Sequence, residues 1–322
     1  MNGASSVLAP GGPAARTLAE LGWPLLVGFT AVSIVMLGLL VWLVTRRTGS
    51  FAEHAPLEPG EDRAAMRWVA LLGFALPGAA FIAAFVATLG VMRALPMSHE
   101  AQARAEIRVT GHQWWWEVEY RVGPDPSRWF RTANELHIPA GRGVDVALES
   151  ADVIHSFWVP RLHGKVDLIP GRTNELRLQA AAPGVFQGAC AEFCGLQHAK
   201  MRFLVVAESP ADYAGWLARQ SAPAVAVSGE KAERGQQVFM QSACPMCHTI
   251  GGTGALATVG PNLTHVGSRR TLGADALPKD HATLHAWVMN APSLKPGTRM
   301  PALTQLTGPE LHALVAYLEA LQ

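Results

Sequence analysis

Two long apolar runs near the start of the chain differ from everything that follows them. Residues 21–45 and 68–92 contain no charged side chain. As helices rising about 1.5 Å per residue, both runs are long enough to cross a hydrocarbon core about 30 Å thick. Pro77, inside the second run, is tolerated in a membrane helix. The pattern predicts a transmembrane helical hairpin over residues 21–93, preceded by an N-terminal outer segment at 1–20.

Buried core helices and a cleaved signal peptide fit the two runs less well than membrane spans do. Core helices of a soluble protein are normally shorter and carry a polar stripe. A signal peptide has a shorter apolar region, whereas the first run is followed by Arg46 and Arg47 and by no clear A-x-A site. The loop between the runs holds four arginines and the outer flanks one each, Arg16 and Arg93, so we expect the loop in the cytoplasm and both termini outside.

After the second run the pattern changes to short apolar or alternating stretches separated by Gly, Pro and Asn. Their spacing is typical of a β-sandwich or small barrel and predicts an all-β domain over residues 94–207. Residues 208–229 read as a short helix followed by a flexible linker. Residues 230–322 show helical periodicity and end in a helix capped by Thr307 and Glu310, which predicts an all-α domain.

Composition supports a membrane-bound rather than a nucleic-acid-binding protein. Charged residues make up 16% of the chain, well below the roughly 25% of soluble domains, and apolar residues 49%. The net charge of +1 gives no electrostatic reason for nucleic acid as a partner. Four cysteines, all between Cys190 and Cys247, are too few for a disulfide scaffold at this length.

One loop of the β region carries the donor set of a copper site. Cys194, His198 and Met201 follow the order of a blue-copper ligand loop, which uses two imidazoles, a thiolate and a weak thioether. His155, near the end of an upstream strand, is the candidate for the second imidazole. Cys190 adds a second thiolate on the same loop, and two thiolates can bridge two copper ions. The spacing therefore favours a binuclear copper centre.

Two alternatives use fewer of these residues. A structural zinc site also accepts two cysteines and two histidines, but it leaves the soft thioether of Met201 unused. A disulfide between Cys190 and Cys194 leaves both histidines without a role. Copper is the interpretation that uses all five side chains.

The motifs of the β region, taken with the hairpin, match one known family in order. G-H-Q-W-W-W-E-V-E-Y, D-V-I-H-S-F-W-V-P, K-V-D-L-I-P-G-R and C-A-E-F-C-G-L-Q-H-A-K-M resemble subunit II of the haem–copper cytochrome c oxidases. The resemblance implies a cupredoxin-like domain holding the dinuclear copper centre CuA. The ligands that it implies are His155, Cys190, Cys194, His198 and Met201, with the backbone carbonyl of Glu192.

The same resemblance implies two further roles. The side chain of Glu192 would bind a magnesium ion at the interface with subunit I. Trp114, the first of three consecutive tryptophans, would be the surface entry point for electrons, whereas the other two are expected in packing. The family also places a glutamate near the second membrane helix at a proton path. Glu61 and Asp62 lie near that position, but the local pattern does not align, so neither receives the role.

The last domain carries an attachment signature for c-type haem. In C-P-M-C-H, Cys244 and Cys247 would form thioethers and His248 would be the proximal iron ligand. The distal ligand is expected to be Met300, in a loop before the last helix, rather than Met289, whose helical position fits packing. Three histidines are weaker candidates: His265, His281 and His285. The signature and G-P-N-L resemble class I cytochromes c.

The whole chain is therefore expected to be the electron-input subunit of a respiratory terminal oxidase. Electrons would pass from a donor through haem c and CuA to haem a in subunit I, which reduces O2 to water and translocates protons. The expected partners are subunits I and III, the membrane, and as donor either cytochrome c or a quinol–cytochrome c reductase. The expected location is the bacterial inner membrane, with the redox domains outside.

Two rival functions remain open to test. A membrane-tethered copper and haem carrier outside any oxidase would keep the same ligands. A quinol oxidase subunit II would keep the fold but lack copper ligands, which this sequence has.

Overall fold

The structure is a computed structural model that describes residues 6–46, 61–95, 105–126, 129–224 and 226–322. The chain divides into two compact units, Arg16–Leu95 on one side and Met1–Ala15 with Pro96–Gln322 on the other. The side chains of Glu61 and Asp62, which received no role above, lie outside the described residues.

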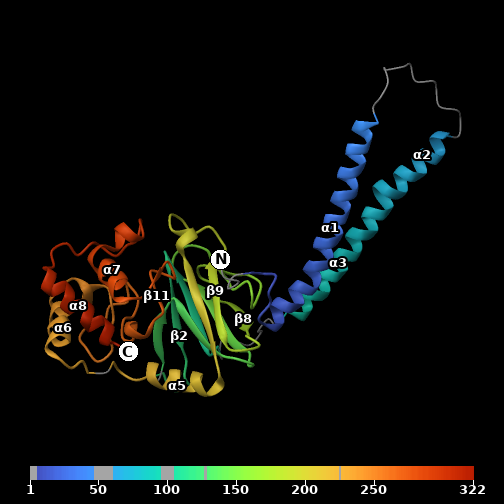
Figure 1. Cartoon of the computed structure of the whole chain (residues 1–322). Coiled ribbons are helices and arrows are strands. Elements are labelled where there is room, and N and C mark those ends of the chain that lie inside the picture. Colours follow the sequence, from blue (N-terminus) through green and yellow to red (C-terminus); the bar gives the residue numbers. More distant parts are fainter. Residues whose placement is uncertain (1–5, 47–60, 96–104, 127–128, 225) are drawn as a thin grey trace. The chain divides into compact units, whose positions relative to one another are not determined.

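The first unit is helical, as the apolar runs predict (Figure 1). Its spans are Pro13–Thr45 and Met66–Ala94, and no part of their most apolar stretches is buried within the described chain. The first helix starts at Pro13, before the uncharged run, and Pro77 lies in the first turn of the last helix, where its missing N–H costs little. The elements are α1 (Pro13–Thr45), α2 (Glu61–Ala70), the π-helical turn η2 (Leu71–Ala75) and α3 (Leu76–Ala94).

The β domain of the second unit is a sandwich, which confirms the expected all-β class. Among the described residues it has two five-stranded sheets, ordered β3-β2-β1-β5-β8 and β4-β10-β9-β6-β7. Strands β1 and β5 run parallel, as do β4 and β10, and the remaining pairs are antiparallel. The strands are β1 (Ile107–His112), β2 (Trp115–Tyr120), β3 (Phe130–Ala133), β4 (Glu135–Pro139), β5 (Val144–Ser150), β6 (His155–Trp158), β7 (Val166–Leu168), β8 (Asn174–Leu178), β9 (Gly184–Cys190) and β10 (Arg202–Glu208).

Aromatic side chains from both sheets fill the core of this sandwich. Trp116 is 1% exposed and contacts Phe157 and Phe203 edge-on, with ring centroids 6.1 and 5.1 Å away. These residues come from β2, β6 and β10, so the core ties together strands of both sheets.

The segment expected to link the domains is largely fixed on the β domain. Residues Pro210–Gln220 form helix α5, whose first turn is capped by Ser209. Trp216 of this helix stacks on His137 with ring centroids 4.0 Å apart and contacts Tyr120 at 5.0 Å. The connection to the next domain is therefore shorter than residues 208–229.

The C-terminal domain is helical, as predicted. Its first and last helices pack together, with the rings of Phe239 and Tyr317 5.9 Å apart. The last helix starts as expected, with the backbone N–H of Thr307 donating to the carboxylate of Glu310 at 2.9 Å. The elements are α6 (Glu230–Gln241), η5 (Cys244–Met246), η6 (Val266–Ser268), β11 (Thr271–Leu272), β12 (Leu277–Pro278), α7 (His281–Leu294) and α8 (Gly308–Ala320).

We expect Trp116→Ala to lower the free energy of unfolding by about 3–5 kcal/mol, because it leaves a cavity in the core of the sandwich. Trp115→Ala is the matched control, since Trp115 is half-buried and stacks on His112 with centroids 4.4 Å apart. Urea unfolding of the full chain in detergent, followed by circular dichroism, measures both. Equal losses in the two variants would contradict this assignment of the core.

Candidate copper and haem centres

Strand pairing brings the copper candidates to one end of the second sheet. β6 begins at His155 and β9 ends at Cys190, and the two strands are paired with Phe157 opposite Cys190. The loop after β9 then carries Cys194 and His198 before β10 starts at Arg202. The ligand atoms of His155, Cys190 and Cys194 lie within 4.8 Å of one another.

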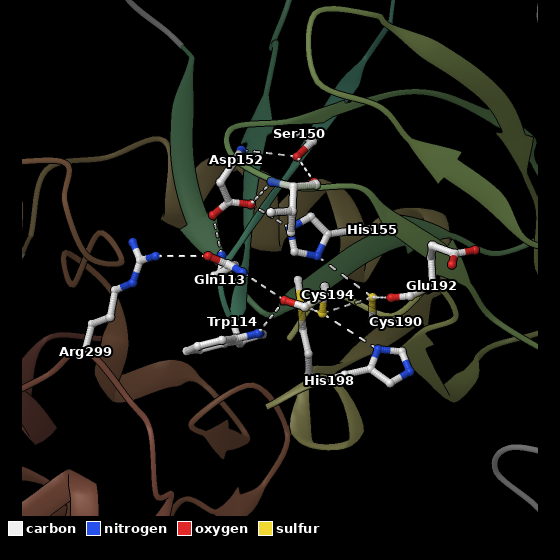
Figure 2. A network of polar contacts seen from close by, with 12 residues as sticks. Gln113, Trp114, Ser150, Asp152, His155, Cys190, Glu192, Cys194, His198 and Arg299 are labelled. Atoms are coloured by element: carbon white, nitrogen blue, oxygen red, sulfur yellow. Dashed lines mark hydrogen bonds and ion pairs between the residues drawn. The ribbon is translucent and has the colours of Figure 1, made fainter. Parts of the chain in front are cut away.

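The donor atoms near Cys190 form one group. Its Sγ lies 3.9 Å from His155 Nδ1 and 3.2 Å from the carbonyl oxygen of Glu192 (Figure 2). The carboxylate of Glu192 is 43% exposed and lies 3.5 Å from Lys165 Nζ. The carbonyl and the carboxylate of Glu192 therefore belong to different surroundings.

The donor atoms near Cys194 form a second group. Its Sγ lies 3.7 Å from His198 Nδ1 and 3.8 Å from Met201 Sδ. The sulfur atoms of Cys190 and Cys194 are 3.7 Å apart, so the two groups of donor atoms meet at this pair of sulfur atoms. Each group has one imidazole and one weak donor, a carbonyl in the first and a thioether in the second.

A carboxylate that sequence reasoning missed orients the first imidazole. Asp152 Oδ1 lies 2.8 Å from His155 Nε2, and its Oδ2 accepts the backbone N–H of Gln113 at 2.7 Å. Because Nε2 is engaged, Nδ1 is the nitrogen that faces the sulfur atoms. Gly111 leaves room for the ring, since a Cβ there would lie 2.7 Å from His155 Cδ2.

The two thiols ionise unequally. The hydrogen bond with Cys194, opposed by burial, lowers the pKa of Cys190 to about 3. The pKa of Cys194 is raised, because its proton is held in that bond and because it is buried. The site therefore offers a thiolate at neutral pH, the form that binds soft metal ions.

These donors fit copper better than the alternatives. Sulfur and imidazole ligands with a thioether are typical of copper, and the two groups offer both thiols to two ions. A tetrahedral zinc site would leave the Met201 thioether and the Glu192 carbonyl without a role. Both cysteines are free thiols in this structure.

The three tryptophans beside this loop have different surroundings. Trp114 is half-buried and its indole N–H donates to the carbonyl of Cys194 at 2.9 Å. Trp115 stacks on His112, and Trp116 is in the core. Sequence reasoning missed Gln113, whose side-chain amide donates to the same Cys194 carbonyl at 2.9 Å.

The haem candidates form a second site in the helical domain. His248 Nδ1 is hydrogen-bonded to the carbonyl of Pro261 at 2.8 Å, which leaves Nε2 as the nitrogen able to bind iron. Burial lowers the pKa of His248, although that hydrogen bond opposes the shift, so the ring is neutral as a ligand must be. Gly260 lies against the ring, and a Cβ there would be 2.7 Å from His248 Cε1.

The remaining haem candidates are two cysteines and two methionines. Cys244 and Cys247 lie directly before His248, at and after the short helix η5, and both are free thiols. Met300 is half-buried in the loop between α7 and α8, whereas Met289 on α7 is 43% exposed. The two cysteines and the available imidazole nitrogen of His248 suit a covalently held haem, and Met300 stays the predicted distal ligand.

The three weaker histidine candidates have other surroundings. His265 is 8% exposed beside Arg269. His281 Nδ1 lies 3.0 Å from the Glu319 carboxylate, and the ring of His285 lies 4.9 Å from that of His312.

Fold and donor sets together are typical of a membrane redox protein, with a β domain suited to copper and a helical domain suited to c-type haem. The family model described as cytochrome C oxidase subunit II, periplasmic domain, matches residues 121–208, and one described as cytochrome c matches residues 232–322. The β domain thus belongs to the cytochrome c oxidase subunit II family and the C-terminal domain to the cytochromes c, which confirms the resemblance seen in the motifs.

Two individual relatives agree with this assignment. Cytochrome c oxidase subunit 2 of Alkalihalophilus pseudofirmus is 41% identical over 216 residues, which cover 67% of this chain and 61% of that protein. The Bacillus subtilis protein of the same name is 30% identical over 233 residues, covering 69% and 64%. The chain thus spans under two thirds of the length of these relatives. A crystal structure of the periplasmic domain of subunit II of cytochrome oxidase from Bradyrhizobium japonicum is 32% identical, covers 36% of this chain and 93% of its own, and has a TM-score of 0.34.

We expect Asp152→Asn to weaken copper binding by about 10–100-fold, because the His155 ring loses the carboxylate that fixes its orientation. Asp167→Asn is the matched control, since the Asp167 carboxylate is 42% exposed and pairs only loosely with Lys165 at 3.5 Å. Competition with a chelator, measured on the full chain in detergent, compares the affinities. Equal copper affinities in Asp152→Asn and the wild type would show that Asp152 does not support the site.

Proposed function

We propose that this chain is the electron-input subunit of a respiratory terminal oxidase. It passes electrons from a donor through haem c and CuA to haem a in subunit I, where O2 is reduced to water and protons are translocated. The observation that carries this proposal is that two donor sets suited to one-electron centres lie within one compact unit of the chain.

The copper donors are held so that little needs to move when an electron arrives. His155 and Met201 are fully buried, and Cys190 and Cys194 are 6% and 3% exposed. Copper held by these residues would supply one-electron chemistry. In this proposal the ligands are His155, Cys190, Cys194, His198 and Met201, with the carbonyl of Glu192.

The C-terminal domain receives electrons first. Cys244 and Cys247 would hold a haem covalently, with His248 as its proximal ligand and Met300 as its distal ligand. A methionine ligand raises the reduction potential, which suits a carrier placed between a donor and an oxidase.

The membrane unit anchors the chain and meets its partners. In this proposal both termini and both redox domains lie on the outer side of a bacterial inner membrane. The four arginines in the loop between the two apolar runs support this orientation. The apolar side chains of the two spans, exposed within the described chain, fit lipid and the helices of subunits I and III. The exposed carboxylate of Glu192 is available for a magnesium ion at the subunit I interface.

A membrane-tethered carrier that serves no oxidase remains the alternative. The two functions are distinguished by the proteins that co-purify with the chain. Co-purification with a large haem-containing membrane subunit supports the oxidase, and a chain that purifies alone with both centres loaded supports the carrier. The electron donor is either cytochrome c or a quinol–cytochrome c reductase. Comparing the rates at which the two reduce the haem distinguishes them.

We expect the wild-type chain to bind two copper ions and to show haem reduction before copper reduction when mixed with reduced donor. Cys190→Ser removes one bridging thiolate and should abolish the mixed-valence paramagnetic spectrum, so that electrons stop at the haem. Stopped-flow absorbance and metal analysis of the full chain measure both effects. Copper that is reduced before the haem, or one copper per chain, would refute this electron path.

We expect Met300→Ala to abolish the weak near-infrared band of a methionine-ligated oxidised haem and to lower its potential, because the thioether ligand is lost. Met289→Ala should leave the band and the potential unchanged, since Met289 lies partly exposed on α7. Absorption spectra and redox titration of the full chain decide between them. The opposite result would make Met289 the ligand.

A further inference from the structure

The loop between β9 and β10, residues 191–201, is called the copper loop here. It contacts the C-terminal haem domain at residues 295–300, which we call the junction segment. Gln197, directly before the copper candidate His198, is 3% exposed. Its side-chain amide donates to the carbonyls of Lys295 at 3.2 Å and Pro296 at 2.8 Å. The loop that carries the copper ligands is therefore bonded to the segment that leads to Met300.

Lys295 makes a second contact at this place. Its side chain is almost fully buried, and its Nζ donates to the carbonyls of Trp114 at 3.3 Å and Gly273 at 2.8 Å. Within the part of the chain that the structure describes, no carboxylate pairs with it. Burial, with a smaller repulsion from Lys200, lowers the pKa of Lys295 to about 8. A buried ammonium without a carboxylate is costly unless its N–H groups are hydrogen-bonded, and here it donates to one backbone carbonyl from each domain.

Beyond these contacts, a chain of hydrogen bonds crosses from the junction segment to a copper ligand. Arg299 Nη2 donates to Gln113 Oε1 at 3.1 Å, and Gln113 Nε2 donates to the carbonyl of Cys194 at 2.9 Å (Figure 2). The indole N–H of Trp114 donates to the same carbonyl at 2.9 Å. Two side chains therefore converge on one ligand, and Arg299 is the neighbour of Met300 in the sequence.

Other contacts join the two domains away from the copper loop. Glu135, 3% exposed, accepts the backbone N–H groups of Arg270 at 2.6 Å and Thr271 at 2.9 Å. Gln187 donates to Asp275 at 2.6 Å. These hydrogen bonds join the two domains but involve none of the copper candidates. A substitution at one of them therefore tests the effect of domain docking without changing the contacts near copper.

Resting on the proposed function, we propose that the junction segment is a fixed electron-transfer contact, in which Lys295 and Gln197 are positioning residues and Gln113 provides the bonded route to Cys194. The step transfers one electron, oxidising the haem iron and reducing the copper pair, with no bond made or broken and no proton moved. A separate donor protein docking beside Trp114 would have to displace this segment. External donors therefore reach the copper through the haem domain.

The first test compares Gln113→Leu and Arg299→Met with Gln187→Leu as the matched control. The full chain, loaded with haem and copper in detergent, is reduced at the haem by a ruthenium photoreductant, and copper reduction is followed optically. Gln113→Leu and Arg299→Met should slow the transfer several-fold with the haem and copper spectra intact, and Gln187→Leu should not. Arg299 bonds to none of the copper candidates, so it keeps the test valid if Gln113→Leu disturbs copper binding.

The second test uses Lys295→Met, which keeps the length of the side chain and removes its charge. The ratio of undocked to docked haem domain should rise about ten-fold, the loss expected for a hydrogen bond made by a charged group. Transfer should then depend on solvent viscosity, and added reduced soluble cytochrome c should reduce the copper directly and faster than in the wild type. A merely structural role for Lys295 would change neither of these readouts.

Each result decides between distinct failures. Wild-type transfer rates in both Gln113→Leu and Arg299→Met would overturn the proposed route. Equal slowing in Gln187→Leu would mean that the substitutions act only by weakening the docking of the two domains. A viscosity-independent Lys295→Met would overturn the positioning role. No transfer from haem to copper in the wild type would instead refute the proposed function.

Discussion

The pairing of β6 with β9 is the constraint on which the copper site depends. It puts Phe157 opposite Cys190 and so brings His155 to the start of the copper loop. Because side chains alternate across a sheet, a slip of one residue would turn Cys190 or His155 to the opposite face. The core around Trp116 holds this register, since its ring contacts Phe157 on β6 and Phe203 on β10. Packing in the middle of the sandwich therefore fixes the positions of the copper candidates at its end.

The sequence was informative wherever donors lie close together along the chain. Cys190, Cys194, His198 and Met201 share one loop, and the haem cysteines share one pentapeptide, so their spacing alone indicates the chemistry. The helical, β and helical order of the domains also followed from hydrophobic periodicity. The extent of the first helix and the packing of α5 did not, because both depend on tertiary contacts.

The residues that support the site could not be found in this way. Asp152 is three residues from His155, and that spacing is a weak signal in a loop. Gln113 and Arg299 meet across 186 positions of sequence, and Lys295 reaches Trp114 across 181. Contacts between residues so far apart follow from how two domains pack, which no local pattern encodes. A buried lysine in particular would be read from sequence as a surface residue.

Glu192 presents its two oxygen-bearing groups to different surroundings. Its carbonyl lies 3.2 Å from the sulfur of Cys190, whereas its carboxylate is partly exposed beside Lys165. A charge or ion that binds the carboxylate would therefore act, through a few covalent bonds of a single residue, on an oxygen next to the proposed copper site. A change of charge at this exposed carboxylate would therefore alter the reduction potential of the buried site.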